Sequence, residues 1–436
     1  MNSLDFVHAF CLAGVAIYIW RREPPRLLLT SLMLISIFVL YGVGNIVYFA
    51  GADTVPQVRE AVTSCLILMW FGLVIGIEIA RAGSPPLTAR SEQVVRRWRA
   101  TKIFDRSQGD QLLAVLGILA ALYIAAVFIY YGKHSQILEF AATQSSTDKA
   151  RYRHDFGAEG GYVYQTLIAS VAPFLSFVLL VKGVALKRRY LGAIGLVVAA
   201  AVFAGKVGTF EKTPWLIYLL QIMVVFQAAK SLKFGVGRIL LLSVVMLAGV
   251  TLAVMIALPQ LDAVDILEWL GYRFFEVNNE VVYQTFYVYP QYLPHTWGMN
   301  IGLIHNLFGS GELTSAHSRV ASFFGAEGAT FDSFFIGDAW VDFSYGGVLI
   351  MSLIVGFVVK TVDLFVVSLG KTPLCVALLG SGIYGLFQLE VTSAFTAFLS
   401  GGLVFIPLLA YASAGLVADL TRGAGVTGTG EAPWRR

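Results

Sequence analysis

A short charged segment, residues 205–214, lies between two strongly apolar stretches of the chain. It contains Lys206, Glu211 and Lys212. Charges beside membrane-spanning segments are costly unless they meet a counter-charge, so they are candidates for function. Both lysines suit the phosphate of a headgroup or substrate. The simpler interpretation is an interfacial turn whose lysines extend to water while Glu211 pairs locally. A P-loop is excluded, because the preceding glycine and the strand of that motif are missing.

A second candidate is the segment 271–280, GYRFFEVNNE. In a helix, Arg273, Glu276 and Glu280 would share one face. Two interpretations stay open. The three residues form a local ion pair of little energetic weight, or Arg273 binds a phosphate through its planar guanidinium while Glu276 acts as a base.

The third candidate is the segment 317–347, which contains His317, Arg319, Asp338 and Asp342. The two aspartates are one helical turn apart, directly before an apolar stretch. Such a pair can supply a general base or bind a cation, and His317 is a further candidate base. The alternative is that solvated acids cap a helix N-terminus, where the helix dipole favours negative charge.

No cofactor and no metal site are expected. His295, His305 and His317 are separated by ten and twelve residues, which matches no metal motif. The three cysteines fall in apolar stretches, so neither a disulfide framework nor a thiolate site is indicated.

Composition requires that these residues be positioned by a membrane bundle. Hydrophobic residues make up 57% and charged residues 13% of the chain, and the mean hydropathy of +0.73 excludes an ordinary soluble domain. The net charge of +4 gives no reason to expect a nucleic-acid partner. We expect an all-α polytopic protein with about eleven spans, at 4–20, 27–50, 61–80, 111–131, 161–181, 191–204, 215–229, 239–258, 343–359, 374–391 and 396–418.

The basic residues orient these spans. With gaps and tails numbered alternately, 22 of the 31 Lys and Arg residues fall on one side, which the positive-inside rule makes cytoplasmic. The N-terminus is then outside and the C-terminus inside, and 19 of the 27 Asp and Glu residues lie on the outer side. A basic patch in this outer part, with Arg151 and Arg153, binds phosphate or lipid headgroups. Phosphate is favoured, because outer segments are normally poor in Lys and Arg.

The spans divide the chain into four parts. Residues 1–258 form the bundle of spans 1–8, residues 259–342 a large outer loop, and residues 343–420 spans 9–11; residues 421–436 form a disordered cytoplasmic tail. The loop is too long for a plain connector and too aromatic for a disordered one. Leu267–Tyr289 and Trp297–Phe308 are interpreted as amphipathic helices within it.

The segment 331–360, FDSFFIGDAWVDFSYGGVLIMSLIVGFVVK, resembles the signature of Wzy-type O-antigen polymerases, which join oligosaccharide repeat units. In that family a polar, glycine-containing loop enters a span through an acid, an aromatic–glycine pair and a run of aliphatic residues. The turn GKVGTFEKT and the loop start YRFFEVNNE are similar to that family as well. The chain departs from the pattern in carrying Asp338 where a glutamate is expected.

The resemblance implies a GT-C-like glycosyltransferase of the bacterial inner membrane, acting on its periplasmic face. Undecaprenyl-diphosphate-linked glycans would be both donor and acceptor, and a partner that regulates chain length is compatible with the class. Asp338, then Glu276, with His317 as a fallback, would deprotonate the acceptor. Cationic side chains would stabilise the departing diphosphate without a metal: Lys206, Lys212, Arg273, Arg319, Arg151 and Arg153.

Two rival classes share the architecture. An O-antigen ligase would use the same donor but transfer a finished glycan to another lipid. A flippase or other transporter would usually keep ionisable residues near the bilayer midplane and show related halves. The predicted spans are nearly free of charge at their centres, which favours an enzyme at the outer face.

Overall fold

The computed structural model covers the whole chain, and the structure describes residues 3–105, 109–143, 152, 156, 159–233, 251, 263–309, 315–326 and 333–413. These residues are mainly helical and contain no strand, only one isolated bridge between Arg26 and Lys233. Within this described part, nine helices are long and apolar enough to cross a membrane. The chain is a helical multi-pass membrane protein, as its composition predicts.

Nine of the predicted spans coincide with these nine helices. The largest difference is at the predicted span 343–359, which is part of a much longer helix, Phe335–Ser368. Apart from residue 251, the predicted span 239–258 lies outside the described residues, and the last one, 396–418, is described only as far as residue 413. The count of eleven therefore stays a prediction.

The chain forms two compact units that alternate along the sequence. Unit 1 contains residues 1–100, 230–368 and 386–397. Its helices are α1 (Ser3–Arg22), α2 (Leu29–Ile37), α3 (Gly44–Gly51), α4 (Pro56–Gly83), α5 (Pro85–Arg97), α14 (Ala263–Gly271), α15 (Val277–Val288), α16 (Gly302–Phe308), α17 (Ala316–Phe323) and α18 (Phe335–Ser368), with π-helical turns η1 (Phe38–Val43) and η3 (Tyr272–Glu276).

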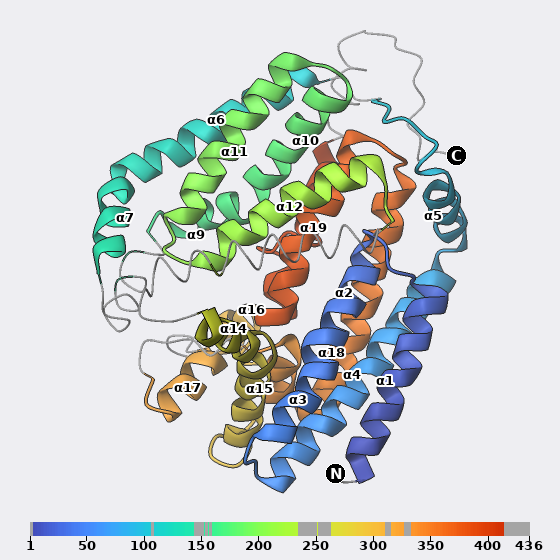
Figure 1. Ribbon diagram of the computed structural model, residues 1–436, viewed down its shortest axis with the longest axis vertical. Coiled ribbons are helices and arrows are strands. Elements are labelled where there is room, and N and C mark those ends of the chain that lie inside the picture. The colour runs from blue at the N-terminus through green and yellow to red at the C-terminus, as the bar shows by residue number, and fades with distance from the viewer. Residues whose placement is uncertain are drawn as a thin grey trace. The chain divides into compact units, whose positions relative to one another are not determined.

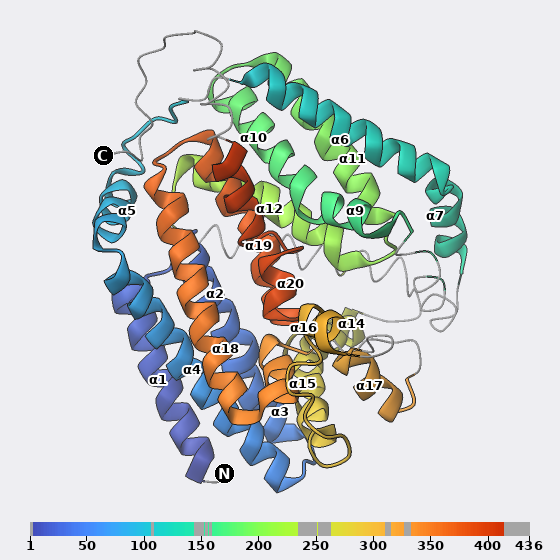
Figure 2. The same ribbon diagram turned by 180° about the vertical axis from the view of Figure 1, so that it is seen from behind.

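Helices α4 and α18 form the centre of unit 1. They run side by side and parallel, with α1 and α2 next to them (Figure 1), and the reverse view agrees (Figure 2). Glycines permit the close approach. A Cβ added at Gly76 would lie 2.2 Å from the Leu353 carbonyl oxygen, and one at Gly356 would lie 2.3 Å from the Leu73 carbonyl oxygen. Small residues at helix contacts are typical of packing in lipid, where backbones must come close to gain dispersion energy.

A buried ion network joins the residue after α1 to α4 and α18. Glu23 is 3% exposed and accepts hydrogen bonds from Arg81 (2.7 Å) and Lys360 (2.5 Å). Removing one partner would leave an uncompensated buried charge, so the network stabilises the arrangement of the three helices.

Unit 2 contains residues 101–229, 369–385 and 398–436. Its helices are α6 (Asp110–Tyr130), α7 (Lys133–Ala142), α9 (Gly161–Thr166), α10 (Ala172–Ala185), α11 (Arg189–Val207), α12 (Lys212–Lys230) and the first part of α19 (Pro373–Val391), with η2 (Leu167–Val171) between α9 and α10; α20 (Ala394–Phe398) spans the boundary of the two units. Helices α10 and α11 approach at Gly183 and Gly192, where a Cβ on Gly183 would lie 2.3 Å from the Gly192 Cα. Lys182 of α10 bridges Asp105 (2.8 Å) and Asp110 (2.7 Å).

The described residues of the long segment 259–342 are largely helical. The predicted amphipathic segment Leu267–Tyr289 corresponds to the run α14, η3 and α15. Helix α15 packs against α3, α4, α17 and α18, so its apolar face contacts protein. The second predicted helix, Trp297–Phe308, is shorter than expected and begins at Gly302. Residues 297–301 instead form a turn, with Gly298 at a φ of 89°.

Candidate functional site

Helix α18 is broken near its start, and the break separates the two acids from the spanning part. Phe343 (φ −137°, ψ 21°) and Ser344 (φ 55°, ψ −147°) leave the helical conformation. About 20 residues cross a bilayer core, and residues 345–368 are long enough alone. The first turns of α18 therefore form a separate short element that carries Asp338 and Asp342 on one face.

Asp342 organises the turn that precedes α16. Its Oδ1 accepts hydrogen bonds from the hydroxyl of Thr296, from the backbone N–H of Gly298 (3.1 Å) and from that of Asn300 (3.3 Å). Asp342 is 3% exposed. It is not a solvated helix cap, and its role in this geometry is structural, because three donors converge on one oxygen.

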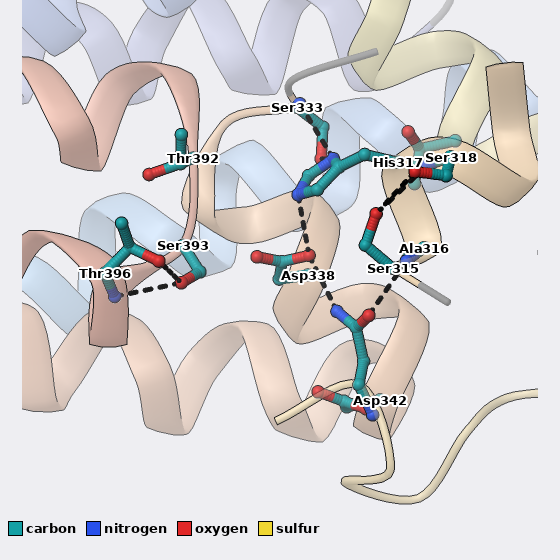
Figure 3. Close-up of polar contacts among 12 residues, drawn as sticks. Ser315, Ala316, His317, Ser318, Ser333, Asp338, Asp342, Thr392, Ser393 and Thr396 are labelled. Atoms are coloured by element: carbon teal, nitrogen blue, oxygen red, sulfur yellow. Dashed lines mark hydrogen bonds and ion pairs between the residues drawn. The ribbon is translucent and has the colours of Figure 1, made fainter. Parts of the chain in front are cut away.

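Asp338, like Asp342, is bound by several groups through a single oxygen, Oδ1, and one of these groups is His317. His317 Nε2 lies 3.2 Å from Asp338 Oδ1 (Figure 3). The backbone N–H of Ser333 donates to His317 Nδ1 at 3.2 Å, so Nδ1 is the unprotonated nitrogen. His317 is then neutral in this geometry, carries its proton on Nε2 and donates that proton to Asp338. In this arrangement His317 orients the Asp338 carboxylate through Nε2. Its basic nitrogen, Nδ1, already accepts the Ser333 N–H.

Asn300 fixes the same carboxylate from a second direction. Its Nδ2 donates to Asp338 Oδ1 (2.9 Å), and its Oδ1 accepts from the backbone N–H of Ala316 (2.9 Å), the first residue of α17. The amide therefore ties the turn before α16, the start of α17 and the start of α18 to one another. Both donors use Oδ1, and among the described residues none hydrogen-bonds to Asp338 Oδ2. That oxygen is available to accept a proton.

Thr392 and Ser393, from a distant part of the chain, are drawn beside this region, and their hydroxyls hydrogen-bond to Gln388 and Thr396 of their own segment. In Figure 3 the second oxygen of Asp338 points away from His317, toward the side where Thr392 and Ser393 are drawn. This segment is tied to the start of α18 through Tyr41, whose ring stacks on Phe334 (3.8 Å between centroids) and whose hydroxyl donates to the Glu390 carbonyl.

Two buried donors near Asp338 lack a described partner. The Tyr289 hydroxyl and the Arg319 Nε are both buried and make no hydrogen bond within the described residues. Tyr289 is fully buried, and its carbonyl accepts from Trp340 Nε1 (2.9 Å), which lies between the two acids in α18. Burial raises the pKa of the Tyr289 hydroxyl, nearby Arg319 opposes the rise, and Asp342 and Asp338 add to it. The structure thus brings together the predicted residues His317, Arg319 and Asp338.

Arg273 and Glu276 occupy a second cluster of unit 1, at η3. The backbone makes a π-helical turn here, and Arg273, Glu276 and Glu280 all act electrostatically on the Tyr272 hydroxyl. Glu280 accepts from the Tyr272 hydroxyl (2.9 Å) and from Gln284 (3.1 Å). Burial raises the pKa of Tyr272, helped by its hydrogen bond to Glu280 and opposed by Arg273.

Lys206 belongs to unit 2, at the end of α11. It is 1% exposed, so the interpretation of a lysine reaching out to water is wrong for this residue. Its Nζ lies over two aromatic rings, 4.7 Å from the centroid of Tyr384 and 5.9 Å from that of Tyr218. The Tyr218 hydroxyl is 2.9 Å from that of Ser176. No carboxylate of the described residues pairs with Lys206.

The remaining predicted cations are not placed in detail. Lys212 begins α12, but its side chain lies outside the described part of the structure, as do Arg151 and Arg153. Across the described ranges, no group of three or more His, Cys, Asp or Glu residues has the arrangement of a metal site.

Sequence reasoning missed Tyr289, Asn300 and Ser333. All three lie in the 259–342 segment. Tyr289 ends the predicted amphipathic helix Leu267–Tyr289 and Ser333 lies in the segment 331–360, but nothing in these patterns singles them out. Asn300 lies in a turn whose backbone N–H groups donate to Asp342, so the signal that reveals it is a contact between residues far apart in the chain.

Comparison of the sequence with models of known protein families gave no match, and comparisons with known proteins and with solved structures gave no significant match. The geometry of the two buried sites therefore carries the functional argument.

Proposed function

We propose that this chain is a membrane glycosyltransferase that joins lipid-diphosphate-linked oligosaccharide repeat units into a polysaccharide, as Wzy-type polymerases do. The observation that supports it is Asp338, a carboxylate held through one oxygen by two neutral donors while the other has no described partner. A base in this chemistry needs a fixed direction and an open oxygen.

The reaction requires one proton transfer and one displacement. An acceptor hydroxyl attacks the anomeric carbon of the donor glycan, and its proton passes to Asp338 Oδ2. The bond from the anomeric carbon to the phosphate oxygen breaks, and its electron pair leaves with the undecaprenyl diphosphate. Glu276 remains the second candidate for the base, with His317 behind it, because the Nδ1 of His317 already accepts the Ser333 N–H.

The leaving diphosphate needs cations, and Lys206 has the most suitable surroundings. A buried ammonium that faces aromatic rings and pairs with no described carboxylate keeps its donors for an incoming anion. Lys212, Arg273, Arg151 and Arg153 complete the proposed set. The enzyme would act in the bacterial inner membrane, with its N-terminus and its site in the periplasm and its C-terminus in the cytoplasm.

The test is a reconstitution of the purified chain in lipid vesicles with undecaprenyl-diphosphate-linked repeat units. Wild type should release undecaprenyl diphosphate and form products of two or more repeats. Asp338→Asn should lower the rate of coupling by about a hundredfold, the lower range for general base catalysis. Glu280→Gln is the matched control, because it neutralises an acid of the second cluster, and it should leave the rate unchanged. If wild type couples no repeat units, the proposed activity is refuted. If Asp338→Asn couples them at the wild-type rate, Asp338 is not the base.

An O-antigen ligase would share this chemistry, and cells distinguish the two. A strain that carries Asp338→Asn should accumulate lipid-linked single repeats if the chain is a polymerase. Long polymer that is made but not transferred would indicate a ligase instead.

A further inference from the structure

Two buried hydrogen-bond donors beside Asp338 have no partner within the described part of the chain. Buried polar groups in folded proteins are nearly always satisfied, and an unsatisfied donor destabilises the fold. Yet the Tyr289 hydroxyl and the Arg319 Nε have no partner among the residues described. A donor in this state can bind a group that lies beyond the described residues.

Both donors belong to the cluster of Asp338. Arg319 follows His317 by two residues in α17, and His317 contacts Asp338. Tyr289 is held against α18 by the hydrogen bond from Trp340 to its carbonyl. Its hydroxyl keeps its proton at neutral pH, because burial raises its pKa, and it therefore acts as a donor.

The unsatisfied groups have a definite chemistry: two donors, from Tyr289 and Arg319, and one acceptor, Asp338 Oδ2. A sugar hydroxyl gives one proton and accepts two, so it complements this set. A diphosphate offers only acceptors, and it would place negative oxygens beside a carboxylate. The charge balance agrees, because the carboxylates of Asp338 and Asp342 outnumber the guanidinium of Arg319 while His317 is neutral in this geometry.

We propose that Tyr289 and Arg319 hold a hydroxyl of the acceptor sugar beside Asp338, so that this cluster is the acceptor-glycan subsite. This inference rests on the proposed function. It adds Tyr289 as a substrate-binding residue, and it moves Arg319 from the diphosphate to the acceptor. The attacking hydroxyl gives its proton to Asp338 Oδ2, its oxygen forms the bond to the anomeric carbon, and the diphosphate departs with the electron pair of the broken bond.

The experiment measures binding of two probes to the full chain in lipid nanodiscs. The first is the repeat-unit oligosaccharide released by mild acid from the host's own lipid-linked glycan and freed of phosphate, and the second is inorganic diphosphate. Tyr289→Phe should weaken oligosaccharide binding about tenfold, the value of one lost hydrogen bond, and leave diphosphate binding unchanged. The thermal midpoint should not fall, because the hydroxyl has no described partner to lose.

The matched control is Thr63→Val, which removes another buried hydroxyl without a described partner from the same unit. It should change neither binding constant. The proposal is overturned if wild type does not bind the oligosaccharide, if Tyr289→Phe binds it as wild type does (a site filled by water), or if Tyr289→Phe loses diphosphate instead. Failure of the proposed function would look different: oligosaccharide binding would depend on Tyr289, but lipid-linked repeats would not be coupled.

Discussion

Asp338 in unit 1 and Lys206 in unit 2 are both buried ionisable residues near the end of a spanning helix, but their surroundings differ. Asp338 is held through one oxygen by the neutral side chains of Asn300 and His317. Lys206 is held by the faces of Tyr384 and Tyr218. In the first case directional hydrogen bonds fix the group, and in the second a non-directional attraction to ring faces stabilises it.

The difference separates two chemical tasks. A base needs a defined orientation, and neutral donors supply it while one oxygen stays open. A receptor for an anion needs its donors free, and aromatic faces stabilise an ammonium without using its N–H groups. One unit thus carries an arrangement suited to proton transfer, and the other carries one suited to a phosphate.

The largest effect on stability is expected at Asp342, the acid next to Asp338 whose three hydrogen bonds give it a structural role. Asp342→Ala should destabilise the chain by about 3 kcal/mol, because the Thr296 hydroxyl and two backbone N–H groups would lose their shared acceptor. Asp342→Asn should cost only about 1 kcal/mol, because its amide oxygen can still accept from all three donors. Thermal midpoints in nanodiscs check both values. Equal loss in the two variants would show that the charge, and not the acceptor oxygen, matters.

Lys206→Met tests the other half of the comparison. It should weaken the binding of inorganic diphosphate about tenfold, because one charge-assisted contact disappears, and leave oligosaccharide binding unchanged. The thermal midpoint should stay the same or rise, because an ammonium without a described carboxylate partner leaves a buried position. Binding titrations of inorganic diphosphate and of the repeat-unit oligosaccharide against Lys206→Met measure both affinities. A large fall in stability at unchanged diphosphate affinity would assign Lys206 to structure.

The sequence predicted the parts of this comparison unequally. Apolar length located nine described spans, because crossing a bilayer imposes a strict requirement on composition. That His317, Arg319 and Asp338 belong to one candidate site was also predictable, because all three fall in the segment 317–347. Tyr289, Asn300 and the rings around Lys206 were not, since long-range contacts bring them in. The π-helical turn at Arg273 was missed for a related reason: nothing in YRFFE differs from an ordinary helix.

Tyr384 offers a smaller test of how Lys206 is stabilised. Tyr384→Leu removes the nearer ring and should weaken diphosphate binding about fivefold, since a cation–π contact contributes about 1 kcal/mol. Tyr384→Phe keeps the ring and should bind diphosphate as wild type does. If the two variants bind equally weakly, the hydroxyl is responsible, and the aromatic faces do not explain the site.

The smallest expected effect is that of Arg273, and it tests whether this residue belongs to the proposed diphosphate-binding cations. It is exposed in η3, where solvent and salt screen its charge, in contrast to Lys206. Arg273→Ala should therefore weaken diphosphate binding about twofold at low salt, and the difference from wild type should vanish at high salt, whereas that of Lys206→Met should persist. Titrations of inorganic diphosphate at two ionic strengths measure this. A loss in Arg273→Ala that equals the loss in Lys206→Met and resists salt would place the phosphate site in unit 1, and the division of tasks between the two units would fail.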